Sequence, residues 1–139
     1  MAWTTYLRAA TAGASAGLRT LTAPAVTLAA AGNQWAWLVG AAAAGELVMD
    51  KLPATPSRLR PVGLGGRIVS GGFCGAALAL RDEEAPWLRG ALCGALAAVA
   101  AAFAGNRWRK AAADRGWPDL PAALAEDALA LLSARAANA

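Results

Sequence analysis

Four stretches of small apolar residues, separated by short polar or charged stretches, make up most of this chain. They cover residues 12–31, 35–50, 61–80 and 86–105, and they consist mainly of alanine, glycine, leucine and valine. A helix needs about 20 apolar residues to cross a bilayer, and only the second stretch is clearly shorter. The pattern predicts an all-α, polytopic membrane helical bundle of about four glycine- and alanine-rich transmembrane helices, forming a single domain over residues 1–139.

The last part of the chain, residues 114–139, has a different pattern. Leu120, Leu124 and Leu131 recur at intervals of four and seven, and acidic residues lie between them. This spacing indicates one apolar face of a helix, and we expect Asp119 to cap its first turn. Because the segment is charged, we do not expect it to cross a membrane. It is predicted to be a cytoplasmic amphipathic helix that lies at the membrane surface or packs on the bundle.

Composition supports the membrane interpretation without deciding it. Hydrophobic residues make up 58% of the chain, above the roughly 45–50% of soluble domains. The mean hydropathy of +0.40 is modest because alanine and glycine supply much of the apolar content. Composition alone is therefore also compatible with an alanine-rich soluble bundle.

The distribution of charge favours the membrane. If the four stretches are spans, most basic residues fall on one side, and only Arg81 and Arg89 fall on the other. The first group is Arg8, Lys51, Arg58, Arg60, Arg107, Arg109, Lys110 and Arg115. Basic residues accumulate on the cytoplasmic side of membrane proteins, so we expect both termini to be cytoplasmic. The tryptophans agree with this, since they lie near the predicted span ends, where indole rings prefer to sit: Trp3, Trp35, Trp37, Trp87, Trp108 and Trp117.

Glycines recur at four-residue spacing inside the predicted spans. The pairs are Gly13 and Gly17, Gly71 and Gly75, and Gly90 and Gly94. Small residues at this spacing allow transmembrane helices to approach closely. They predict helix packing contacts and, because four thin helices enclose little on their own, a homo-oligomer.

Ionisable residues interrupt the apolar stretches in two places. Glu46 and Asp50 are four positions apart and hence on one helical face, with Lys51 next to them. Arg19 and Arg67 lie on neighbouring predicted spans, and Arg67 is expected to pair with Glu46 or Asp50. Charges inside a membrane protein mark either a pathway for an ion or solute, or an ion-pair network that holds helices in register. The sequence leaves both interpretations open.

Prolines predict where the chain departs from a regular helix. Pro24 is expected to kink or break the first span, and Pro53 and Pro56 to place residues 51–60 in a basic loop. Glu126 and Asp127 could form ion pairs with Arg58 and Arg60 in that loop and latch the tail across the cytoplasmic mouth. Alternatively, the two acids form the solvated face of the tail helix.

A weak internal repeat is visible. Gly17-Leu18-Arg19 resembles Gly65-Gly66-Arg67 about fifty residues later, and repeated hairpins are common in transporters. Alanine-rich sequence also produces such matches by chance, so duplication stays open.

Several function classes are disfavoured. The chain has no histidine, and no metal-ligand spacing, phosphate-binding loop or nucleophile–base pair is present, so we expect no enzyme, metal or cofactor. Cys74 and Cys93 lie in apolar segments and are expected to be packing residues. The basic residues sit at segment ends and not in a stripe with interleaved aromatics, which argues against nucleic acid.

The run Glu46-Leu47-Val48-Met49-Asp50-Lys51-Leu52-Pro53 is the most specific part of a wider resemblance. With Gly17-Leu18-Arg19 before it and Pro56-Ser57-Arg58 after it, the chain resembles the bacterial membrane family called domain of unknown function 4126. The later run from Gly71 to Ala76 and the Pro121…Glu126-Asp127 tail are similar to it as well. The resemblance implies a small multi-span membrane protein, expected in the bacterial inner membrane, and no established activity.

Two functions remain from the sequence. The first is a homo-oligomeric channel or carrier for an ion or small solute that uses the charged cluster around Glu46 and Asp50. The alternative is a non-transporting structural or assembly subunit of a larger membrane complex. The partners expected are the lipid bilayer, further copies of the chain and an unidentified membrane partner.

Overall fold

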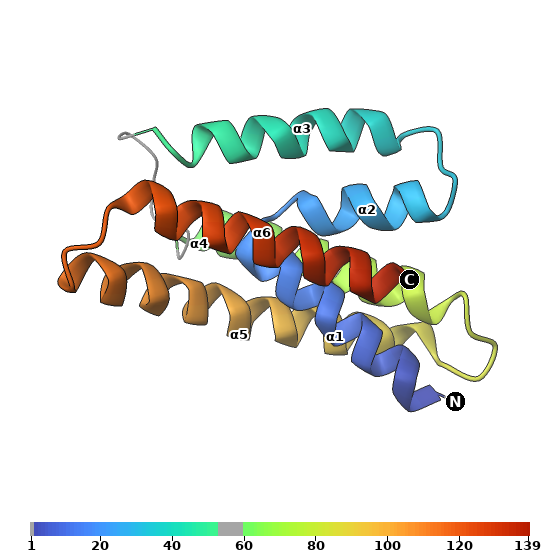
Figure 1. Cartoon of the computed structure of the whole chain (residues 1–139). Coiled ribbons are helices and arrows are strands. Elements are labelled where there is room, and N and C mark those ends of the chain that lie inside the picture. Colours follow the sequence, from blue (N-terminus) through green and yellow to red (C-terminus); the bar gives the residue numbers. More distant parts are fainter. Residues whose placement is uncertain (1, 53–59) are drawn as a thin grey trace.

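The chain folds into helices joined by short turns. A computed structural model describes residues 2–52 and 60–139, and this part of the chain contains six helices and no strand. The helices are α1 (Ala2–Leu18), α2 (Thr22–Ala30), α3 (Ala36–Met49), α4 (Pro61–Ala79), α5 (Trp87–Asp114) and α6 (Asp119–Asn138). Successive helices run in opposite directions (Figure 1), so helix ends collect at two ends of the molecule. We call them the cluster end (residues 19–21, 50–52, 60 and 115–118) and the terminal end (residues 2, 31–35, 80–86 and 139).

Three helices, α1, α4 and α5, form the centre of the molecule through very close contacts. A Cβ atom added to Gly13 or Gly71 would overlap the carbonyl oxygen of Gly94, and one added to Gly75 would overlap that of Gly90. The six glycines that the sequence predicts for helix packing all lie at such contacts, with Gly17 against Ala98. Their small faces are therefore occupied within one chain, and they do not by themselves support a homo-oligomer.

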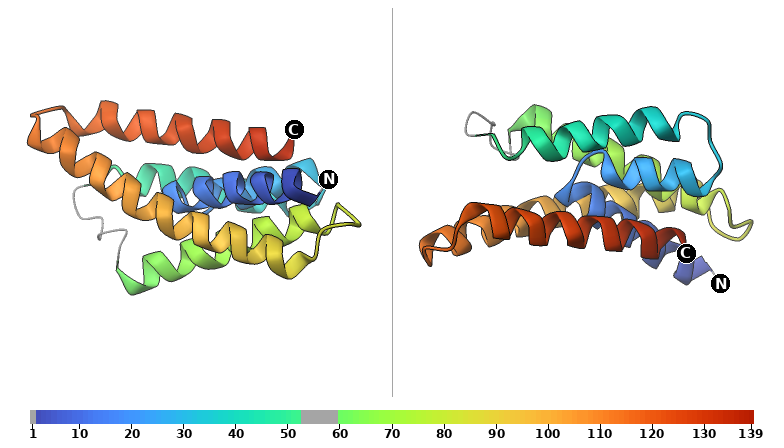
Figure 2. Two further views of the ribbon diagram at one scale, coloured as in Figure 1. Left: turned by 90° about the horizontal axis from the view of Figure 1, so that it is seen from below. Right: turned by 45° about the horizontal axis from the view of Figure 1, so that its top comes forward.

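The outer helices pack around this centre. The last helix, α6, lies along α1 with its alanines inward, and Ala123, Ala130 and Ala134 are fully buried. Helix α2 contacts α4 and α6, and α3 forms an outer layer on α2 (Figure 2). Ala43 is the one buried residue of α3. The tail helix thus packs on the bundle, which is one of the two placements that the sequence left open.

Small residues occupy the interior and large apolar ones the surface. Among the described residues, Leu18 and Leu78 are the only large aliphatic or aromatic side chains that are buried, and the other buried hydrophobic residues are alanines and one cysteine. Leu96, Val69 and Leu132 are examples of large side chains that face outward. Leu120, Leu124 and Leu131 are also exposed, so the leucine face of α6 points away from the bundle and not towards it.

The first predicted span is not one helix. The chain reverses direction at residues 19–21, which separates α1 from α2. The predicted break at Pro24 is wrong by a few residues, because Pro24 occupies the first turn of α2, where its missing N–H has no helical partner to lose. The predicted helix end at residue 105 is also wrong, since α5 continues to Asp114.

This reversal changes which basic residues lie at each end of the molecule. Arg8 lies at the terminal end, where its Nε donates to the carbonyl oxygen of Ala137 at 2.8 Å. The prediction that groups Arg8 with Lys51 and Arg109 is therefore wrong, because it assumed a single span over residues 12–31. By length and composition, α4 and α5 are each long and apolar enough to cross a membrane. The expectation of four such spans is not shown by the helix lengths, since α2 has 9 residues and α3 has 14.

Candidate functional site

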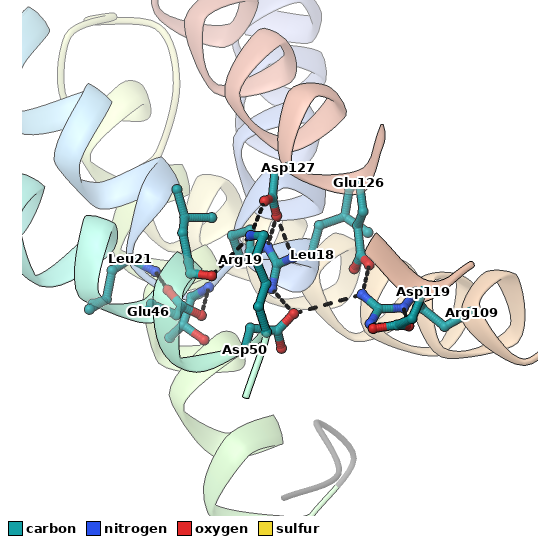
Figure 3. Close-up of polar contacts among 12 residues, drawn as sticks. Leu18, Arg19, Leu21, Glu46, Asp50, Arg109, Asp119, Glu126 and Asp127 are labelled. Carbon is teal, nitrogen blue, oxygen red and sulfur yellow. Dashed lines mark hydrogen bonds and ion pairs between the residues drawn. The ribbon is translucent and has the colours of Figure 1, made fainter. Parts of the chain in front are cut away.

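The candidate site is built around the reversal between α1 and α2, at the cluster end. Arg19 lies in this reversal and its side chain is fully buried. Its Nη1 atom is 2.6 Å from Oδ2 of Asp50, at the end of α3, and its Nε donates to Oδ1 of Asp127, in α6, at 2.5 Å. One buried guanidinium thus joins three segments that are far apart in the sequence (Figure 3).

Two further cations extend the network. Lys51 Nζ lies 2.7 Å from Oδ2 of Asp127. Arg109, in α5, places Nη2 at 2.6 Å from Oδ1 of Asp119 and Nη1 at 3.4 Å from Oε2 of Glu126. The Nη1 atom is also 3.7 Å from Oδ2 of Asp50, which links the two halves of the network (Figure 3).

Glu46 accepts hydrogen bonds from the backbone just before α2. Its two carboxylate oxygens accept hydrogen bonds from the backbone N–H groups of Thr20 and Leu21, each at 2.8 Å (Figure 3). The first N–H groups of a helix lack intrahelical partners and carry partial positive charge. A carboxylate from α3 therefore satisfies the backbone N–H groups of the reversal up to Leu21, the N-cap residue of α2.

Arg67 donates hydrogen bonds to the backbone carbonyl groups at the end of α1. From the second turn of α4, its Nη1 donates to the carbonyl oxygens of Gly17 and Leu18, the latter at 2.9 Å. Ser70, one turn later, donates its hydroxyl to the carbonyl oxygen of Thr20. The last carbonyls of a helix are also without intrahelical partners. An acid on α3 and a base on α4 thus hold the two sides of the reversal.

The terminal end carries a smaller polar group. Thr5 donates its hydroxyl to Asp82, in the turn between α4 and α5. This hydrogen bond, and a second from the backbone N–H of Glu84, hold the pKa of Asp82 below its usual range. Arg81 Nη2 donates to the carbonyl oxygen of Thr27 at 2.9 Å, and the side-chain amide of Asn138 donates to the Thr27 hydroxyl at 3.2 Å. These contacts join α1, α2 and α6 to that turn.

The structure brings together most residues that the sequence singled out. Arg19, Glu46, Asp50, Lys51 and Arg67 all lie at the reversal or directly beside it. The expected partner of Arg67 was Glu46 or Asp50, whereas the hydrogen bonds described for Arg67 run to the carbonyls of α1. Arg19, which interrupts an apolar segment of the sequence, is paired with Asp50 and Asp127.

The contacts of Glu126 and Asp127 differ from the predicted ion pairs with the basic loop. Glu126 is buried and Asp127 half-buried, so the interpretation of both as a solvated face is wrong. Lys51 reaches Asp127, but Arg60 is exposed and, in the described ranges, has no ion pair with either acid. The other proposed members of this loop, Pro53, Pro56 and Arg58, lie outside the described residues.

Sequence reasoning missed the roles of two residues. The sequence predicts Arg109 in a basic flank after a helix end at residue 105, whereas Arg109 lies within α5 and contacts Asp119 and Glu126. Asp119 was expected to cap α6; it is instead in the first turn of α6 and contacts Arg109. The suggested repeat has no structural counterpart at its arginines, since the chain reverses at Arg19 but continues through Arg67 as one helix.

Every acid of the network lies beside at least one cation, and four acids share three cations. Arg19, Lys51 and Arg109 face Asp50, Asp119, Glu126 and Asp127, and Glu46 faces backbone donors. No grouping of acids and cysteines that could hold a metal ion occurs among residues 2–52 and 60–139. Ion pairs of this kind hold helices in register, and the removal of one partner leaves a buried charge uncompensated.

Comparisons with protein-family models, curated proteins and solved structures find no match to this chain. The resemblance to the family called domain of unknown function 4126 therefore stays a prediction.

Proposed function

We propose that the chain is an integral membrane protein. The support is the distribution of its side chains, with large apolar groups outside and alanine, glycine and charged groups inside. Soluble monomers rarely expose contiguous apolar surface on this scale, whereas small residues are enriched where transmembrane helices meet. Trp35 and Trp87 at the terminal end and Trp108 at the cluster end are exposed, which suits two membrane interfaces.

The cytoplasmic side of this membrane protein is the cluster end. Six basic residues lie there, Lys51, Arg60, Arg107, Arg109, Lys110 and Arg115, whereas the terminal end carries four, Arg8, Arg81, Arg89 and Arg135. The larger number of basic residues supports a cytoplasmic position for the cluster end under the positive-inside rule. Both termini then face away from the cytoplasm, in contrast to the sequence-based prediction. A bacterial inner membrane is the setting that we propose.

The function that the geometry supports best is that of a non-transporting structural or assembly subunit of a membrane complex. This proposal rests on the contacts of Arg19, whose side chain is fully buried and paired with both Asp50 and Asp127. A group that binds and releases a solute must exchange its partners, whereas these charges join α3, α6 and the reversal. The outer helix α3, with one buried residue, offers its free faces to a neighbour.

A small channel or carrier for an ion or solute is the second candidate. One observation favours it, namely that the helix break coincides with the charged cluster. Transporters build substrate sites at such breaks, where a helix N-terminus faces an anionic group. Here the carboxylate of Glu46 occupies the position that a substrate carboxylate would take.

Flux and stability measured on the same preparations separate the two candidates. Purified protein would be reconstituted in liposomes, and proton, sodium and potassium fluxes compared with protein-free vesicles for wild type, Glu46→Gln and Asp50→Asn. We expect no flux above the protein-free control and a lower melting temperature for both variants. Flux that disappears in Glu46→Gln with unchanged melting would establish the carrier instead. A partner that co-purifies in fixed stoichiometry after mild detergent extraction would identify the complex.

A further inference from the structure

A groove runs between α5 and α6 at the cluster end. The two helices join at residues 115–118 and diverge from there (Figure 2), with α1 between them. The volume of this open groove is about 360 Å³. Its floor is Leu18, and its walls are Ala104, Gly105 and Trp108 of α5 and Ala125 and Leu129 of α6.

The groove is apolar except at one point. Glu126 is its only charged lining residue, and the side chain is 2% exposed. Its Oε2 atom is 3.4 Å from Nη1 of Arg109, so its charge is compensated within the network already described. The groove therefore suits a hydrocarbon chain and offers no free anion to a cationic ligand.

Basic side chains lie near the narrow end of the groove, where α5 and α6 join. Arg107 is next to the lining residue Trp108 in α5, and Arg115 directly follows the end of α5, so both lie at the cytoplasmic part of the groove. Both are exposed, and within the described part of the chain neither forms an ion pair; Arg115 Nη1 donates to the carbonyl oxygen of Ala111. The nearby acids are Asp114, which is exposed, and Asp119, which is paired with Arg109.

Two tryptophans mark the level of the membrane interface at this point. Trp108 and Trp117 contact each other edge to face, with ring centroids 5.9 Å apart. Paired indoles beside a basic rim are typical of the headgroup region of a membrane protein. An apolar groove below that level and free guanidinium groups above it match the two parts of a phospholipid.

We infer that the α5–α6 groove holds an acyl chain of an anionic phospholipid whose phosphate contacts Arg107 and Arg115. Guanidinium groups bind phosphate oxygens through charge-assisted hydrogen bonds, and basic sites between transmembrane helices on the cytoplasmic side recognise anionic headgroups. The inference rests on the proposed membrane residence and orientation, and on neither of the two candidate functions. A second groove, between α2, α3 and α4, has no charged lining residue and therefore selects no headgroup.

The test compares phosphatidylglycerol with phosphatidylcholine of the same acyl chains. Full-length protein in detergent would be titrated with each lipid, with bound lipid counted by native mass spectrometry and the melting temperature followed in parallel. We expect wild type to retain phosphatidylglycerol about tenfold better than phosphatidylcholine, as two basic contacts imply. Equal retention of both lipids by wild type would overturn the inference.

Variants locate the two parts of the site. Ala104→Phe and Ala125→Phe fill the groove from opposite walls and should abolish retention, whereas Ala113→Phe places the same ring elsewhere on the exposed surface of α5. Arg107→Gln with Arg115→Gln should remove the headgroup preference, whereas Arg60→Gln with Lys110→Gln removes equal charge from the same end and should preserve it. Retention that survives both groove variants, or that falls equally in the charge control, would contradict the inference.

Extraction of native membranes with alkaline carbonate keeps the two proposals distinguishable. If wild type is released, membrane residence fails and the lipid site fails with it. If wild type stays in the membrane but shows no lipid preference, only the lipid site is overturned.

Discussion

Arg19 and Asp127 are 108 positions apart in the sequence and form an ion pair in the interior of the bundle. The contact joins the reversal between α1 and α2 to α6, and Asp50 adds α3 to the same guanidinium. A buried arginine without these partners would be strongly unfavourable in an apolar setting. The folded arrangement of the outer helices therefore depends on a few charges whose geometry is fixed by the reversal.

Glu46→Gln should loosen the start of α2. A glutamine side chain has one acceptor oxygen, so it can satisfy only one of the N–H groups of Thr20 and Leu21 that the carboxylate serves. We expect a loss of about 1–3 kcal/mol in the free energy of unfolding and faster amide hydrogen exchange at these two residues. Glu83→Gln, at an exposed turn position, is the matched control and should leave both unchanged.

Glycine-to-alanine substitutions should have opposite signs at two positions. A Cβ at Gly94 would overlap the carbonyl oxygen of Gly71, so Gly94→Ala should force α4 and α5 apart and destabilise the protein by about 1–3 kcal/mol. At Gly40, in α3, a Cβ meets no atom within 4 Å, so Gly40→Ala should stabilise the helix by about 0.5–1 kcal/mol. Thermal unfolding in detergent measures both. Equal effects at the two sites would show that α4 and α5 are not in close contact.

Thr5→Val should change how stability depends on pH. The hydroxyl of Thr5 lowers the pKa of Asp82 in the folded protein, so this carboxylate stabilises the fold above the pKa of about 3.9 that it has when unfolded. That contribution is lost as pH falls through the lowered folded value. In Thr5→Val the pKa should rise towards its ordinary range, and the acid-dependent loss of stability should shrink. Carbon-13 NMR titration of the Asp82 carboxyl group provides the direct reading, and an unmoved pKa would contradict the contact.

Cysteine labelling tests the proposed orientation. With Cys93 replaced by alanine and the buried Cys74 left in place, a membrane-impermeant maleimide should label Glu83→Cys from outside intact cells. Arg60→Cys, at the cluster end, should react only after the cells are permeabilised. The opposite result would place the basic end outside and contradict the charge argument.

The helical content and most helix positions could be predicted from the apolar pattern, and so could the close contacts of the glycines. The reversal at Arg19 could not, because its supports, Glu46 and Arg67, lie on other helices and leave no local signal. The period of Leu120, Leu124 and Leu131 shows that they share a face but not whether that face points inward. In this chain it points outward, since the interior is filled by alanine.

Only one of the two acidic partners of Arg19 could be predicted from the sequence. The position of Arg19 in an apolar segment predicts an acidic partner, and Asp50 belonged to the expected cluster. For Asp127 the sequence predicts either an ion pair with the loop arginines or a position on the solvated face of the tail helix, since a helix with leucines on one face and acids on another usually has its acids in solvent. The inward position of Asp127 follows from the packing of α6 on α1, which no local pattern encodes.

The most direct test of the account is a double-mutant cycle on Arg19 and Asp127. The free energy of unfolding in detergent would be measured for wild type, Arg19→Met, Asp127→Asn and the double variant, with Asp114→Asn as an exposed control. We predict that each single change destabilises the protein and that the double variant is more stable than the sum of the two implies, with a coupling of about 1–3 kcal/mol. Effects that add to within about 0.5 kcal/mol would show that the two residues do not hold the bundle together.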